Sequence, residues 1–86
     1  MSYRLEFAPR VHRQLHRLPR DIQVRLAAAM EALAANPRPH GVKKLSGEEN
    51  LYRIRAGDYR IIYQIRDKEL IVLIVKVAHR REVYRV

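Results

Sequence analysis

The stretch LYRIRAGDYRIIYQI, residues 51–65, decides the fold because it has the pattern of a β-hairpin. Apolar and polar residues alternate on both sides of Gly57-Asp58, which is the period of a strand with one buried face. Gly-Asp is also a favoured two-residue hairpin loop. With that loop, Arg55 lies directly opposite Arg60, and side-chain parity places Arg53, Arg55 and Arg60 on one face.

The arginine face, defined by Arg53, Arg55 and Arg60, meets no structural need of a sheet. Like charges directly opposed on neighbouring strands destabilise the sheet, by up to about 1 kcal/mol for such a pair. A polyanion that neutralises Arg55 and Arg60 together removes that cost. The alternative is a solvated face whose arginines splay apart or pair with acidic residues of the adjoining loops.

A third strand follows the hairpin at residues 70–78, LIVLIVKVA, which is apolar on both faces over most of its length. Such a strand belongs in the interior of a sheet. A short turn at Asp67-Lys68 makes the three strands an antiparallel meander. Continuing the parity count through this turn predicts that the arginine face also carries Ile71, Leu73, Val75, Val77 and His79.

The N-terminal half predicts one strand and two helices. Residues 3–7 alternate like a strand with one buried face. Pro9 suits the first turn of a helix, and Pro19 ends that helix and can begin a second one. Asn36-Pro37 ends the second helix, and residues 37–50 read as a loop. Apolar residues recur at helical spacing, as Val11, Leu15 and Leu18 in the first helix and Ile22, Leu26, Ala29, Met30 and Leu33 in the second.

These elements predict a single α+β domain over residues 1–86. Two N-terminal helices pack on one face of a twisted, mainly antiparallel sheet of about four strands.

The composition is strongly basic. Lys and Arg number 18 against 9 for Asp and Glu, which gives a formal charge of +9, and arginine supplies 14 of the 18. Because the planar guanidinium matches phosphate oxygens in pairs, this bias favours a nucleic acid or another polyanion as partner. A generally basic surface is the alternative.

The chain has no cysteine, so neither a disulfide nor a thiolate metal site is expected. The N-terminal MSYRLEF lacks the apolar core of a signal peptide, and the apolar run LIVLIV at residues 70–75 is too short to span a bilayer. We therefore expect a cytoplasmic protein with no membrane attachment and with neither a metal nor a cofactor.

The segments YRIR, GDYRIIY and AHRREVY, in this order after a strand and a helical hairpin, resemble the RelE/ParE superfamily of type II toxin–antitoxin toxins, and the RelE branch most closely. The resemblance covers essentially the whole chain. It implies the RelE-like microbial RNase fold and a metal-independent, ribosome-dependent endoribonuclease that cuts messenger RNA in the ribosomal A site by 2′-hydroxyl attack.

The resemblance also implies site residues. RelE-type toxins use basic residues on two sheet strands, an arginine after the last strand and a C-terminal tyrosine, which correspond here to Arg53, Arg55, Arg60, Arg80 and Tyr84. Well-known members carry lysine at the first two of these positions. Because arginine does not give up its proton near neutral pH, a lysine general base at those positions is in doubt for this chain.

For proton transfer, His79 is the group in the predicted patch with a suitable unperturbed pKa. A structural or merely exposed histidine is the alternative, as is a Tyr84 that anchors the C-terminal tail instead of stacking on a base. Contacts to RNA or the ribosome are expected from a further basic set, for which a solvated surface is the alternative: Arg10, Arg13, Arg17, Arg20, Lys43, Lys44 and Arg81.

As partners, the resemblance implies a RelB-like antitoxin that neutralises the toxin, the ribosome with its messenger RNA, and operator DNA only through the toxin–antitoxin complex. Two other function classes stay open. One is a ParE-like inhibitor of DNA gyrase on the same fold, and the other is a basic module that binds nucleic acid without catalysis.

Overall fold

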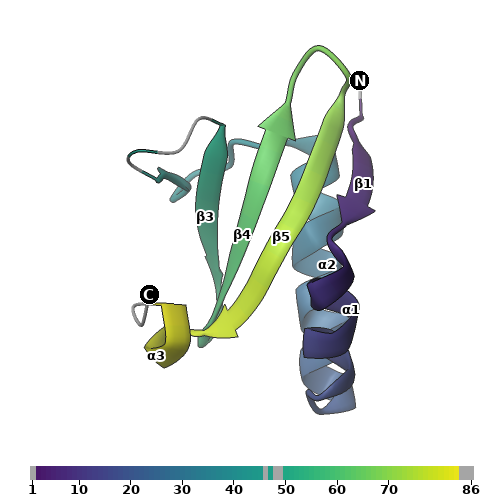
Figure 1. Ribbon diagram of the computed structural model, residues 1–86, viewed down its shortest axis with the longest axis vertical. Helices are drawn as coiled ribbons and strands as arrows, with labels where there is room; N and C mark the ends of the chain where they lie inside the picture. Colours follow the sequence, from purple (N-terminus) through teal and green to yellow (C-terminus); the bar gives the residue numbers. More distant parts are fainter. Residues whose placement is uncertain (1, 46, 48–49, 84–86) are drawn as a thin grey trace.

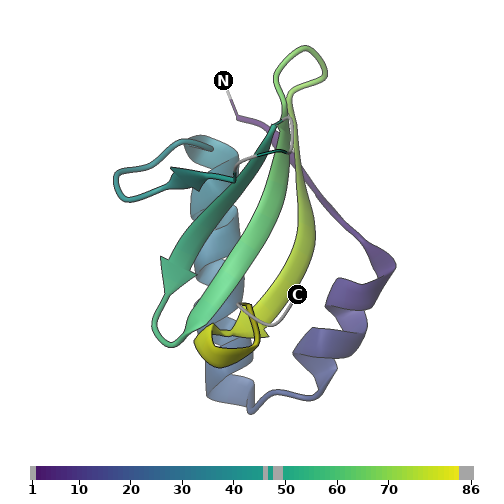
Figure 2. The ribbon, with the colours of Figure 1, turned by 60° about the vertical axis from the view of Figure 1, so that its left-hand side comes forward.

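The computed structural model describes residues 2–45, 47 and 50–83 and has two layers (Figure 1). One layer is a five-stranded sheet with the strand order β1-β5-β4-β3-β2. The helices α1 and α2 form the other layer on one side of the sheet, which Figure 2 shows from a second direction. The predicted architecture of two helices on one face of the sheet is confirmed. In chain order the elements are β1 (Arg4–Phe7), α1 (Pro9–His16), α2 (Arg20–Ala35), β2 (Lys43–Lys44), β3 (Leu51–Ala56), β4 (Tyr59–Arg66), β5 (Ile71–His79) and α3 (Arg80–Val83).

The helices α1 and α2 begin where the prolines predict, but α1 ends at His16, so Leu18 lies in the connection between the helices. Pro9 opens α1 at its first position, where a missing backbone N–H costs nothing, and Pro19 caps the start of α2 in an extended conformation. Asn36 ends α2 in the β region. Within the described residues 2–45, 47 and 50–83, none of the helices has the length and apolar character that a membrane crossing requires.

The core lies between the helices and the face of the sheet that they cover. The predicted apolar stripes supply its helical side, and fully buried side chains of β4 and β5 supply the other side. Tyr63 is completely buried, and its hydroxyl donates a hydrogen bond of 2.7 Å to the carbonyl oxygen of Pro37, so its polar end is satisfied. The buried hydrophobic residues include Val11, Leu26, Met30, Leu33, Ile61, Tyr63, Ile65, Val72, Ile74 and Val77.

The sheet is mixed and has one strand more than the sequence predicts. The edge strand β1 runs parallel to β5, whereas the other pairings are antiparallel. The additional strand, β2, has only two residues and pairs with β3, with Lys43 opposite Arg53 and Lys44 opposite Tyr52. The sequence gives no sign of β2, because two residues in a loop rich in proline and glycine carry no periodicity.

The register of the β3–β4 hairpin is the predicted one. Ala56 pairs with Tyr59, and Arg55 pairs with Arg60. Gly57 has a φ of 62°, as the first loop residue of a type II′ hairpin turn requires, and glycine adopts this conformation without steric cost.

The register of β4 with β5 differs from the prediction in two places. The turn has four residues, from Asp67 to Leu70, rather than two, and Leu70 takes a positive φ of 56°. Farther along, Ile62 pairs with Lys76 and Tyr63 pairs with Ile74, so β5 contains one extra residue. That residue, Val75, forms a β-bulge.

The bulge reverses side-chain parity in the second half of β5. Val77 pairs with Ile61 and is buried in the core, and His79 pairs with Tyr59. The prediction that Val77 and His79 share the arginine face is therefore wrong. Lys76 takes a place on that face instead, because its partner Ile62 lies there between Arg60 and Gln64.

A polar cluster joins three segments that are distant in the sequence. The guanidinium of Arg38 donates two hydrogen bonds to the carboxylate of Asp67, at 3.1 and 2.9 Å, and the hydroxyl of Tyr3 donates a third at 2.7 Å. Arg38 also lies over the ring of Tyr52, 5.3 Å from its centroid. The cluster thus ties the start of β1 and the loop after α2 to the β4–β5 turn.

This cluster predicts an acid-sensitive contribution to stability. The hydrogen bonds from Arg38 and Tyr3 lower the pKa of Asp67 from 3.8 to about 2. Because the folded-state pKa lies below the unfolded one, the contribution is complete above pH 3.8 and disappears as the pH falls through about 2. We expect Asp67→Asn to lower Tm at neutral pH, and we expect the difference from the unaltered protein to vanish near pH 2. Thermal melts from pH 2 to pH 7 measure this.

The matched control is Glu31→Gln, which removes an exposed carboxylate from α2. If both variants give the same Tm difference at every pH, Asp67 has no special role in stability.

Candidate active site

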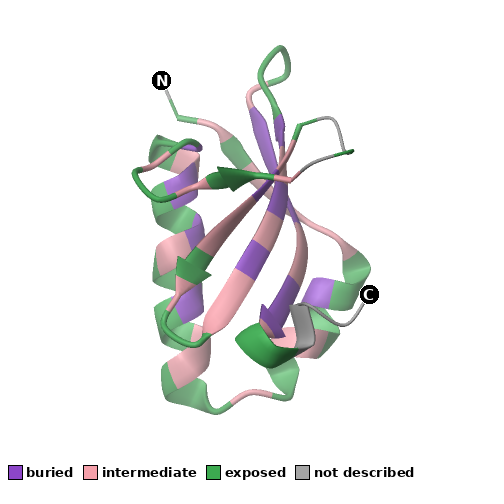
Figure 3. Cartoon of the chain, turned by 90° about the vertical axis from the view of Figure 1, so that its left-hand side faces the viewer, coloured by how far each residue is buried: buried purple, intermediate pink, exposed green. Residues whose placement is uncertain are grey.

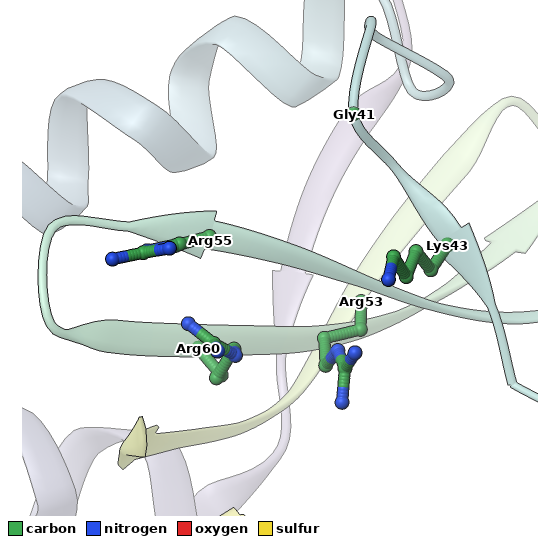
Figure 4. A pocket seen from close by; sticks show the side chains of 5 residues that line it. All are labelled: Gly41, Lys43, Arg53, Arg55 and Arg60. Carbon is green, nitrogen blue, oxygen red and sulfur yellow. The ribbon is translucent and has the colours of Figure 1, made fainter.

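Three predicted site residues lie together in a pocket on the face of the sheet that α1 and α2 do not cover. The pocket has a volume of about 200 Å³ and is lined by Gly41, Lys43, Arg53, Arg55 and Arg60 (Figure 4). In Figure 3, β2 and the start of α3, both exposed, lie near opposite ends of the strands. The cationic side chains of the pocket come from three adjacent strands: Lys43 from β2, Arg53 and Arg55 from β3, and Arg60 from β4.

Strand pairing fixes these side chains in two rows across the sheet. In one row Arg55 of β3 lies beside Arg60 of β4. In the other row Lys43 of β2 lies beside Arg53 of β3. Neighbouring strands are about 4.8 Å apart, so each row holds two cationic side chains at close range.

The arginines differ in how they are held. The Nε of Arg55 donates a hydrogen bond of 3.1 Å to the carbonyl oxygen of Gly57, which orients its guanidinium along the hairpin. Arg60 is half-buried, and its Nη1 atom is inaccessible to solvent. Arg53 is also half-buried, whereas Arg55 is exposed.

The electrostatics of the pocket favour an anion. Four of its five lining residues carry a positive charge, and no acidic residue is among those that line it in the part of the chain that the structure describes. The mutual repulsion of these charges is relieved by an anionic ligand that contacts several of them at once. The planar guanidinium group of arginine can donate two parallel hydrogen bonds to two oxygens of one phosphate group, so a phosphate is the anion that fits this pocket best.

His79 does not join this pocket. It lies on the helix-covered face, where its ring contacts that of Tyr59 edge-on at 5.4 Å. Its Nδ1 accepts a hydrogen bond of 3.3 Å from the backbone N–H of Arg81. His79 also lines a different pocket, with Gln14 of α1 and with Arg17, which follows that helix. The proton-transfer role predicted for His79 depended on a shared face, which the bulge at Val75 prevents.

The predicted residues after β5 lie at the end of the sheet. Arg80 and Arg81 begin α3 and are exposed, and the backbone N–H of Arg80 donates a hydrogen bond of 2.8 Å to the carbonyl oxygen of Asp58. This contact ties the start of α3 to the β3–β4 turn. Neither arginine lines the pocket. Tyr84 lies outside the described residues.

The other predicted contacts to RNA or the ribosome are exposed. Arg10 and Arg13 lie on α1 and Arg17 directly follows it, on the helical side of the sheet and away from the pocket. Arg20 begins α2. Lys44 pairs with Tyr52 and so points to the side of the sheet opposite to Lys43. Their roles stay predictions.

Sequence analysis missed two lysines of the arginine face. The sequence predicts Lys43 as a contact to RNA or the ribosome from a loop, and the structure places it on strand β2, where it lines the pocket. Lys76 is not among the residues that the sequence predicts for the arginine face, and the bulge in β5 places it there, opposite Ile62. A lysine within the otherwise apolar run of residues 70–78 is the one signal in the sequence that β5 changes face. Among the described residues, no three His, Cys, Asp or Glu side chains form a group that could hold a metal ion.

Comparison with known proteins identifies the family of the chain. Residues 5–84 match the family model of the ParE toxin of the type II toxin–antitoxin system parDE. This chain belongs to the RelE/ParE superfamily of type II toxins. Toxin RelG of Mycobacterium tuberculosis is similar to it, with 34% identity over 99% of both chains. The mRNA interferase toxin RelE of Escherichia coli K12 is 30% identical over 98% of this chain and 92% of its own length.

Solved structures place this toxin on the RelE side of the superfamily. The toxin chain in the archaeal RelE–RelB complex of Pyrococcus horikoshii OT3 superposes with a TM-score of 0.82 at 34% identity, over 93% of this chain and 97% of that chain. The toxin–antitoxin complex RelBE2 of Mycobacterium tuberculosis gives a TM-score of 0.80 at 31% identity, over 93% of this chain and 100% of the matched chain. Both relatives were solved together with an antitoxin.

Proposed function

We propose that this toxin is a ribosome-dependent endoribonuclease that cleaves messenger RNA in the ribosomal A site. The observation that carries the proposal is the cationic pocket formed by Lys43, Arg53, Arg55 and Arg60. The RelE relative from Escherichia coli, which is called an mRNA interferase, supports it.

The proposed chemistry uses the nucleophile that RNA itself carries. The ribose 2′-hydroxyl attacks the adjacent phosphorus, and negative charge builds on the phosphoryl oxygens. Arg60 and Arg55, paired across β3 and β4, stabilise that charge through charge-assisted hydrogen bonds, and Arg53 neutralises the same or a neighbouring phosphate. In the same proposal Arg80 contacts the scissile phosphate and Tyr84 stacks on a base. Guanidinium groups supply the charge stabilisation without a metal ion.

A dependence on the ribosome fits so open a site. The pocket offers cations but little enclosure, so alignment of the 2′-oxygen with the phosphorus has to come from another source. Holding the messenger RNA in a bent, splayed geometry is a contribution that the ribosome can make, and proximity of this kind lowers reaction barriers strongly. A ribosomal target implies the cytoplasm as the site of action.

A RelB-like antitoxin is the proposed neutralising partner. The solved relatives from Pyrococcus horikoshii and Mycobacterium tuberculosis are toxin–antitoxin complexes. A partner segment with acidic residues would complement the charge of +9 and mask the pocket. Operator DNA is bound, in this proposal, only by the complex.

A second candidate function is inhibition of DNA gyrase. The matching family model describes ParE toxins, and the fold is shared by both groups of the superfamily. The pocket favours the nuclease, since a site for phosphate chemistry has no role in a protein that acts by binding gyrase alone.

Primer extension on a translated messenger RNA tests the proposal. The purified toxin is added with and without ribosomes, and the Arg60→Ala variant controls for contaminating nucleases. We expect cuts within codons that require ribosomes and that the variant does not produce. A folded toxin that produces no cuts, or that cuts naked single-stranded RNA at the same rate, contradicts the proposal. Inhibition of supercoiling without cuts favours the gyrase alternative.

A further inference from the structure

We infer that Lys43 is a catalytic residue of this site and donates the proton that the departing 5′-oxygen of the RNA requires. The inference rests on the proposed function and adds a role that arginine cannot fill. It assigns proton transfer to strand β2, which the sequence alone does not reveal.

The position of Lys43 is fixed by strand pairing. It lies directly opposite Arg53 and lines the same pocket as Arg55 and Arg60. Figure 4 shows its side chain extending from β2 toward Arg53. A phosphate bound by the three arginines therefore lies within reach of the flexible four-carbon stem of Lys43.

The chemistry of the pocket singles out Lys43. Cleavage of the bond between phosphorus and the 5′-oxygen produces an alkoxide, which is a poor leaving group unless it receives a proton. Guanidinium groups hold their protons too strongly to supply it, and an ammonium group is a considerably stronger acid. Among the described residues that line the pocket, Lys43 is the one whose side chain can exchange a proton in this way.

Two other candidate groups lie elsewhere. His79 is on the helix-covered face, in contact with Tyr59. Lys76 shares the open face but pairs with Ile62, a full strand farther from Arg53, and does not line the pocket. Lys43 is exposed, so water can return a proton to it after each turnover.

The step conserves atoms and charge. The 2′-oxygen forms a bond to phosphorus while its proton passes to a solvent water. The bond between phosphorus and the 5′-oxygen breaks, and the ammonium of Lys43 gives a proton to that oxygen. The products are a 2′,3′-cyclic phosphate and a 5′-hydroxyl, and Lys43 regains its proton from water.

The test uses single-turnover cleavage of messenger RNA bound in the A site of ribosomes. One messenger carries the ordinary phosphodiester at the cleaved position. The other carries sulfur in place of the bridging 5′-oxygen, and a thiolate leaves without needing a proton. The variant is Lys43→Arg, which keeps the positive charge. Its matched control is Lys68→Arg, because Lys68 is an exposed lysine of the β4–β5 turn, far from the pocket.

We expect Lys43→Arg to cleave the ordinary messenger at least about 100-fold more slowly than the unaltered toxin, which is the usual range for loss of a general acid. Cleavage of the sulfur-substituted messenger should stay within a few-fold of the unaltered toxin. Lys68→Arg should match the unaltered toxin on both messengers.

Two results overturn the assignment while leaving the nuclease proposal intact. In one, Lys43→Arg cleaves the ordinary messenger at the normal rate. In the other, it slows cleavage of both messengers equally, which indicates a role in binding or positioning. If the unaltered toxin cleaves neither messenger, the proposed function fails and the inference fails with it.

Discussion

Arg60→Ala is expected to slow cleavage of ribosome-bound messenger RNA by about 10²–10³-fold. Removing one preorganised donor to a charged transition state typically has an effect of this size. Arg60 is the arginine of the pocket that comes from β4, the central strand of the sheet, and its Nη1 is shielded from solvent. A cation held in such a setting acts at lower dielectric than an exposed one, so its loss is not replaced by water.

The measurement is the single-turnover rate at saturating toxin, with circular dichroism to confirm that the variant is folded. Arg66→Ala is the matched control, because Arg66 lies on the same strand and the same face but at its exposed end, in an ion pair with Glu69. It should leave the rate nearly unchanged. Arg60→Lys separates charge from geometry, since lysine keeps the charge but loses the planar fork.

Equal rates for Arg60→Ala and Arg66→Ala would show that the pocket does not contact the reacting phosphate. A large loss in Arg60→Ala that Arg60→Lys does not restore would indicate that bidentate geometry, rather than charge alone, is required.

The hairpin that carries the arginines was predictable because its information is local. The alternation of residues, the Gly57-Asp58 loop and the two-residue period together determine which side chains share a face. Arg53, Arg55 and Arg60 therefore lie together as the sequence predicts. The two proline-marked helix starts are local signals of the same kind.

The rest of the site depends on pairings between distant segments. The bulge at Val75 reverses the face of His79, and the sequence carries no signal of that bulge except Lys76, which follows it within an otherwise apolar run. Lys43 reaches the pocket only because two residues of a long loop pair with β3. The parity count held through the β4–β5 turn, because Ile71 pairs with Arg66 and Leu73 pairs with Gln64 on the arginine face, and it failed only beyond the bulge.

Leu26→Ala is expected to destabilise the toxin by about 2–5 kcal/mol, the usual range for deleting most of a buried leucine side chain. Leu26 has an exposed fraction of 0% in the core between α2 and the sheet. A domain of this size has a total stability of roughly 4–13 kcal/mol, so the variant loses a large part of it. Urea unfolding and thermal melts measure the change, and Tm should fall by more than about 10 °C.

Val24→Ala is the matched control on the same helix, because Val24 is 58% exposed. Removing its methyl groups opens no cavity, and alanine is the better helix former, so the free energy of unfolding should change by less than about 0.5 kcal/mol. Similar losses in both variants would mean that α2 does not pack on the sheet as described. A loss confined to Leu26→Ala would show that α2 supports the strands from behind, which leaves the opposite face of β3 and β4 open for its cationic pocket.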